Sequence, residues 1–117
     1  MSFKKGDIVV IPVPFTDNAS AKIRPAIVLS NAEVHATGDV LVAQITSKIH
    51  NDNLSFTLLA TDMTVALRKQ SYVRIHKLFV LEERLIDKKV SELVPSAYSQ
   101  LVDRMSALPQ HFPNGVH

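Results

Sequence analysis

The stretch KIRPAIVLSN, residues 22–31, decides how this chain is interpreted. Its apolar run after the proline is typical of a buried β-strand, because aliphatic and β-branched side chains pack well on a pleated surface. Pro25 cannot donate a ladder hydrogen bond and therefore belongs at the start of such a strand. Arg24 stands just before it. The stretch thus predicts a strand that holds a permanently charged guanidinium at its beginning, where the guanidinium can bind an anion.

Other apolar runs lie on both sides of this stretch. Residues 6–15 (GDIVVIPVPF), 40–48 (VLVAQITSK), 54–60 (LSFTLLA) and 72–81 (YVRIHKLFVL) each predict a strand. Pro12 and Pro14 indicate that the far end of the first strand is an edge or the start of a loop. Residues 32–39 and 50–53 read as turns, residues 61–71 as a connection with a short helical turn, and residues 82–90 as a turn leading into a short strand or half-turn.

One helix is predicted, over residues 95–108 (PSAYSQLVDRMSAL), with Ser96 as its cap. Its apolar residues recur at three- and four-residue spacing, namely Tyr98, Leu101, Val102, Met105 and Leu108. Several short strands followed by one helix predict a mainly β fold, a small and partly open β-barrel closed by the C-terminal helix. We expect one domain over residues 1–108 and a loose tail over residues 109–117.

Composition excludes several classes of function. The chain has 117 residues, 46% of them hydrophobic, no cysteine and only three glycines. There is no P-loop, no GxGxxG and no GxSxG, and the five histidines show no HxH or HExxH spacing, so we expect no metal and no cofactor. No run of about 20 apolar residues occurs, and the N-terminus does not read as a signal peptide, so we expect no membrane segment and a cytoplasmic location.

Polar side chains at strand ends carry the remaining chemistry. They are Arg24, Thr46, Ser47, Lys48, Ser71, Arg74 and His76. An arginine fork and hydroxyl groups can hold a phosphodiester, and RNA supplies its own nucleophile, the 2′-hydroxyl, so cleavage needs only an electrostatic clamp and a proton carrier. Each residue also has a plainer interpretation. Arg24 can be solvated or paired, Arg74 can be half of a salt bridge, and His76 can be packed or simply exposed.

The order of the motifs resembles the MazF/PemK (Kid) family of toxins from bacterial toxin–antitoxin pairs. The motifs are KKGDIVVIPVPFTD, KIRPAIVLSN, GDVLVAQITSK and QSYVRIHKLFVLEERLI, and the resemblance covers about residues 4–108. It implies a small SH3-like barrel with a terminal helix, a homodimer, and inhibition by a cognate antitoxin. It also implies a metal-independent endoribonuclease that cuts single-stranded RNA at short sequences.

The resemblance also implies roles for individual residues. Arg24 matches the family's catalytic arginine, and Thr46 matches its catalytic threonine or serine. Ser47 is the neighbour of Thr46, and Ser71 falls where members commonly carry a serine. The resemblance assigns no role to Arg74, which lies on the same predicted strand face as His76 and by that geometry is expected to contact RNA or to carry a proton.

His76 is expected either to contact RNA or to carry a proton. Lys22 and Lys48 would attract the RNA backbone. Phe15 could stack on a base or belong to the core. The loop before Arg24, within FTDNASAKIRP, is shorter than in many members and lacks their glutamate-glutamine pair, which leaves the target sequence and the activity itself open.

Two other functions stay open at this point. One is a catalytically silent module that binds RNA or an antitoxin, and the other is a CcdB-like poison of a DNA topoisomerase. The Arg24-Pro25 and Thr46-Ser47 pairs favour cleavage over the topoisomerase poison, which does not need them.

Overall fold

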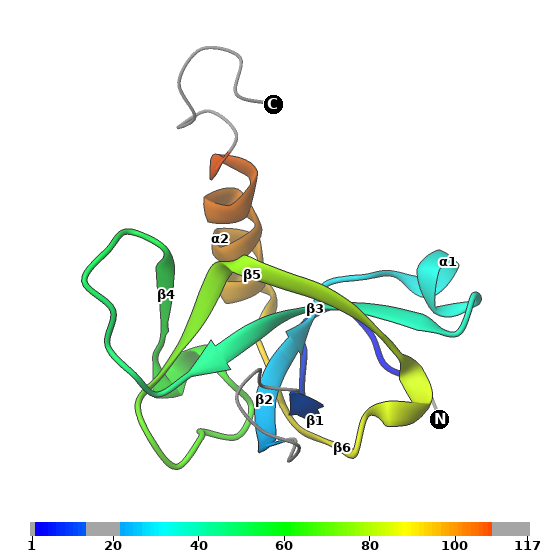
Figure 1. The fold of residues 1–117 in the computed structure, drawn as a ribbon. Helices are drawn as coiled ribbons and strands as arrows, with labels where there is room; N and C mark the ends of the chain where they lie inside the picture. Colours follow the sequence, from blue (N-terminus) through cyan, green and yellow to red (C-terminus); the bar gives the residue numbers. More distant parts are fainter. Residues whose placement is uncertain (1, 14–21, 109–117) are drawn as a thin grey trace.

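The computed structural model describes residues 2–13 and 22–108 and is a curled six-stranded sheet with a C-terminal helix (Figure 1). All neighbouring strands are antiparallel, in the order β4-β5-β3-β2-β1-β6. The predicted fold class is therefore confirmed. The elements are β1 (Asp7–Val13), β2 (Lys22–Val28), α1 (Ala32–His35), β3 (Asp39–Thr46), β4 (Ser55–Leu58), the 3₁₀ turns η1 (Ala60–Asp62) and η2 (Glu83–Leu85), β5 (Ser71–Glu82), β6 (Lys88–Glu92) and α2 (Pro95–Ser106).

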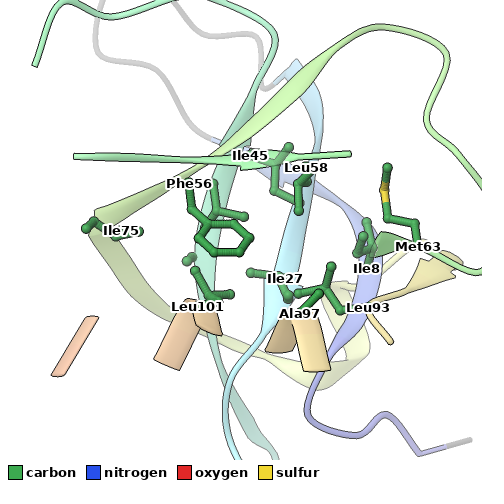
Figure 2. Packing of buried hydrophobic residues seen from close by; sticks show 12 residues of the cluster. Ile8, Ile27, Ile45, Phe56, Leu58, Met63, Ile75, Leu93, Ala97 and Leu101 are labelled. Atoms are coloured by element: carbon green, nitrogen blue, oxygen red, sulfur yellow. The ribbon is translucent and has the colours of Figure 1, made fainter. Parts of the chain in front are cut away.

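Both faces of the sheet are covered, which explains why the strands read as nearly continuous apolar runs. Between the sheet and α2 lies a first cluster, which includes Ile27, Phe56, Ile75 and Leu101 (Figure 2). On the other face lies a second cluster built from the alternate residues of the same strands, including Ile11. We call these the helix-side core and the far-side core. Successive side chains of a strand point to opposite faces, so neighbours in the sequence enter different cores.

Strand β5 is long and bends at an irregular segment. Its end, up to Glu82, pairs with the beginning of β3, while its first residues pair with both β3 and β4. Between these regions the register with β3 shifts. Ala43 pairs with Leu78, but Ile45 pairs with Val73, so β5 has more residues than β3 in this segment. Such irregular pairing bends a strand and increases its twist. Because of it, the start of β5 meets the end of β3.

The element boundaries differ from the predictions in a few places. Ser96 does not cap α2. The cap is Val94, and Pro95 occupies the first turn, where its missing N–H costs nothing and its fixed φ suits a helix. Part of the predicted turn 32–39 is the short helix α1, capped by the Asn31 side chain.

The ends of the other predicted elements follow the expected pattern. Residues 82–90 contain a 3₁₀ turn followed by the start of β6, as predicted, and the connection 61–71 begins within η1. Strand β6 pairs with β1 only as far as Val10, so Pro12 lies where β1 has a partner on one side, as its lack of an N–H requires. The predicted tail 109–117 and Pro14 lie outside the described residues.

Candidate functional site

The two predicted catalytic residues lie in neighbouring strands, Arg24 in β2 and Thr46 at the end of β3. These strands pair as far as Ala26 with Gln44, and Arg24 and Thr46 each lie two residues beyond that last pair. Alternate residues of a strand point to one face, and Ala26 and Val42 of these strands belong to the far-side core. Arg24 is also the partner of Ile11 in β1, whose side chain lies in the far-side core. The pair therefore lies at one end of the sheet, on the face of the far-side core.

The two side chains differ in their surroundings. Arg24 is exposed, and Pro25 behind it is half-buried at the point where β2 enters the core. Thr46 is half-buried, and its hydroxyl oxygen accepts the backbone N–H of Lys48 at 3.0 Å. That bond uses the oxygen as acceptor, so the hydroxyl can still donate its proton to a phosphate oxygen. The arrangement can present a guanidinium and a hydroxyl to one anion.

Three exposed residues surround this pair in the sequence. Lys22 opens β2, and Ser47 and Lys48 follow Thr46 directly. Lys22 and Lys48 add positive charge next to the strand ends, which favours a polyanion. Phe15, the predicted stacking residue, lies outside the described residues.

Arg74 is placed differently from the expected RNA contact. Its side chain is only 6% exposed, and it binds Asp52 through two nitrogens, each at 2.9 Å from a carboxylate oxygen. It also donates to the Ser55 hydroxyl at 2.8 Å. The hydrogen bonds from Arg74 and, next, from the Leu54 N–H hold the pKa of the Asp52 carboxyl well below its usual range. Arg74 thus fastens the loop between β3 and β4, which begins immediately after Thr46.

Ser71 and His76 have other surroundings. Ser71 is buried and donates its hydroxyl proton to the Lys69 carbonyl at 2.9 Å. His76 lies within the irregular segment of β5 and lines a cavity of about 700 Å³ with Leu54, Arg104 and others on the side of α2. Neither Arg24 nor Thr46 lines that cavity. His76 is exposed, and partial desolvation, followed by the charges of Arg74 and Lys77, lowers its pKa, which favours its neutral form.

Sequence reasoning missed Tyr72. This residue pairs with Thr46 in β3 and with Thr57 in β4, and its side chain is half-buried. The alternation within residues 72–81 predicts that Tyr72 and Arg74 point to the same face of the strand. It does not predict that Tyr72 lies beside Thr46, because the pairing of β3 with β5 depends on the register shift between them. No sequence signal reveals that shift.

The described part of the chain offers no sign of metal chemistry or of a membrane segment. Residues 2–13 and 22–108 contain no group of three or more histidine, aspartate or glutamate side chains that could hold a metal ion. Within the same residues, no helix is both long enough and apolar enough to cross a bilayer.

Comparison with known proteins gives one family and a consistent fold. The family model of PemK-like, MazF-like toxins of type II toxin–antitoxin systems matches residues 4–108. A mycobacterial endoribonuclease solved with its cognate antitoxin superposes with a TM-score of 0.74 at 15% identity, covering 96% of this chain and 100% of that chain. MazE–MazF of Deinococcus radiodurans superposes with a TM-score of 0.73 at 23% identity, covering 92% of this chain and 95% of that chain. The Mycobacterium tuberculosis toxin MazF-mt6 superposes with a TM-score of 0.68 at 18% identity, covering 86% of this chain and 92% of that chain. No curated protein matches the chain.

Proposed function

The chain belongs to the family of PemK-like, MazF-like toxins of type II toxin–antitoxin systems, and from this premise we propose that it is a metal-independent endoribonuclease that cuts single-stranded RNA. What supports the proposal is that Arg24 and Thr46 lie in two adjacent strands, on the face that alternation from Ala26 and Val42 assigns to both. An exposed guanidinium beside a hydroxyl is the set of donors that a phosphodiester needs as charge builds on it.

The reaction uses the RNA's own nucleophile. The 2′-oxygen attacks the neighbouring phosphorus, the bond from phosphorus to the 5′-oxygen breaks, and the products are a 2′,3′-cyclic phosphate and a 5′-hydroxyl end. The proton of the 2′-hydroxyl leaves to a base, and the 5′-oxygen gains one. Arg24 stabilises the negative charge on the non-bridging oxygens, and Thr46 donates its hydroxyl proton to one of them.

The surrounding residues bind the rest of the substrate. Lys22, Lys48 and Ser47 are exposed next to the pair and contact the sugar-phosphate backbone, which makes binding depend on salt. Arg74 does not contact RNA in this proposal; its ion pair with Asp52 holds the loop that carries Ser47 and Lys48. His76 remains a candidate proton carrier by residue type, because its lowered pKa favours the neutral form that can accept a proton.

The relatives suggest the partners. One structural neighbour is an endoribonuclease bound to its cognate antitoxin, and another is a complex of MazE with MazF. We propose that a cognate antitoxin likewise inhibits this chain by covering the basic surface around Arg24, that the chain forms a homodimer, and that it acts in the cytoplasm. The family match favours this function over a CcdB-like topoisomerase poison.

The test is RNA cleavage in the presence of EDTA. The purified chain is incubated with a long single-stranded RNA beside Arg24→Ala, Thr46→Ala and Arg84→Ala proteins. Arg84 is the matched control, because it is an exposed arginine paired with Glu82 beyond the other end of β5. We expect chelator-resistant cutting, a loss on the order of a hundredfold or more for each of the first two variants, and no change for Arg84→Ala.

Two results would count against the proposal. Binding of RNA without cutting would identify a silent RNA-binding module. Cutting by Arg24→Ala at the parental rate would leave the family assignment standing and remove the assigned catalytic site.

A further inference from the structure

Tyr72 stands beside the candidate catalytic pair. It is the second residue of β5, and its Cα partner in β3 is Thr46. Its sequence neighbours Ser71 and Val73 are buried, and Val73 belongs to the helix-side core, so the tyrosine side chain points to the opposite face. Cross-strand partners share a face, and the Tyr72 ring therefore rises next to the Thr46 hydroxyl.

The pairing forms a row across three strands. Thr46 in β3, Tyr72 in β5 and Thr57 in β4 follow one another, and Arg24 in β2 lies two residues beyond the last residue of β2 that pairs with β3. Paired neighbouring strands lie about 4.8 Å apart, so Tyr72 in β5 is about one strand spacing from Thr46 in β3. A phosphate held between Arg24 and Thr46 would have the base of an adjoining nucleotide over the tyrosine.

The exposure of Tyr72 fits contact with a base. The residue is half-buried, so it is neither part of a core nor fully open to solvent. An aromatic ring that solvent reaches can stack on a base, and every RNA base presents a π-face. Only seven aromatic residues occur in the whole chain, and Tyr72 is placed by strand pairing directly beside Thr46.

We propose that Tyr72 contacts the substrate by stacking on a base next to the cleaved bond, and that it thereby fixes the phosphate between Arg24 and Thr46. This role rests on the proposed ribonuclease function. It makes Tyr72 a residue that binds and orients RNA rather than one that transfers a proton.

The test combines a protein change with a matching RNA change. The cleaved bond is first mapped on a long RNA, and short RNA oligonucleotides are then made across it, one intact and the others with a single abasic ribonucleotide on either side of the bond. Cleavage of each is measured as kcat/KM for the parent, Tyr72→Phe and Tyr72→Leu. Tyr98→Phe is the matched control, because Tyr98 is half-buried on α2 against the helix-side core.

We expect Tyr72→Leu to lose about tenfold on the intact oligonucleotide, and Tyr72→Phe to lose little because the ring remains. On one abasic oligonucleotide the parent should lose a similar factor, and Tyr72→Leu should lose nothing more, since the same contact is already gone.

The outcomes separate the two levels of inference. A parent that cuts RNA, with Tyr72→Leu equally fast, overturns the stacking role alone. So does a Tyr72→Leu loss that is the same on every oligonucleotide, since it indicates damage to the fold. Should Tyr72→Leu not fold, a parent that cuts both abasic oligonucleotides as fast as the intact one refutes the role. A parent that cuts no RNA overturns the proposed function and this role with it.

Discussion

Replacing Leu101 by alanine should separate stability from activity. Leu101 lies on α2, is fully buried, and packs in the helix-side core with Ile27, Phe56 and Ile75. Removing a fully buried leucine side chain costs about 3–5 kcal/mol, because the lost transfer free energy is joined by the energy of the cavity. For a domain of this size each kcal/mol lowers the melting temperature by about 4 °C, so the expected shift is roughly 10–20 °C.

Activity should respond differently. The candidate pair lies on the face of the far-side core, and Leu101 does not reach that face. Measured well below its own melting temperature, Leu101→Ala should therefore cut RNA within about twofold of the parent. Ile11→Ala is the matched variant: Ile11 is equally buried, belongs to the far-side core, and is the strand partner of Arg24. It should lose comparable stability and, because Arg24 loses its support, also lose activity on the order of tenfold.

The assay has two parts, thermal unfolding followed by circular dichroism and RNA cleavage at a temperature at which each variant is fully folded. Val102→Ala controls for the helix itself, since Val102 is the exposed neighbour of Leu101 and its loss should change neither quantity much. Equal loss of activity in the folded Leu101→Ala and Ile11→Ala proteins would refute the assignment of the site to one face of the sheet.

Two further predictions concern the polar residues at the bend of β5. Asp52→Asn should lower the melting temperature more than Arg74→Met does, because Asp52→Asn leaves a buried guanidinium without its anion, whereas Arg74→Met leaves a carboxylate that water can reach. Thermal unfolding of the two variants tests this. A larger loss for Arg74→Met would contradict the assigned burial. His76 has a lowered pKa in the folded chain, so near the ordinary value of 6.5 the unfolded chain binds more protons than the folded chain. The free energy of unfolding should therefore fall as the pH drops through about 6.5. Urea titrations from pH 8 to pH 5 should show a smaller fall in this free energy for His76→Gln than for the parent.

Local chemistry explains which parts of the structure the sequence predicts. The strands follow from apolar runs, but the predicted start of the second strand at Pro25 is wrong, because β2 begins at Lys22 and contains both Arg24 and Pro25. Pro25 is tolerated inside β2 because at that position β2 pairs with β1 alone. Helix α2 follows from its spacing of apolar residues, although its first residue depends on Pro95 rather than on Ser96. These features need information from only a few neighbouring residues.

Contacts between distant strands were beyond the sequence. Because both faces of the sheet are buried, alternation of polar and apolar residues is weak, and the register of β3 against β5 leaves no trace in either strand. The neighbour of Thr46 could therefore not be identified as Tyr72. The ion pair of Asp52 with Arg74 joins residues 22 positions apart and was equally hidden, although a salt bridge was among the interpretations open for Arg74.

The two arginines of the candidate site illustrate how one residue type serves two purposes. Arg24 is an exposed residue of β2. Arg74 is buried and already holds a carboxylate through two nitrogens and a hydroxyl through one, so an RNA phosphate would have to displace Asp52 to reach it. A carboxylate beside the substrate repels a polyanion, and pairing with Arg74 neutralises it. The buried arginine therefore fixes the loop that follows Thr46 and neutralises the carboxylate of Asp52.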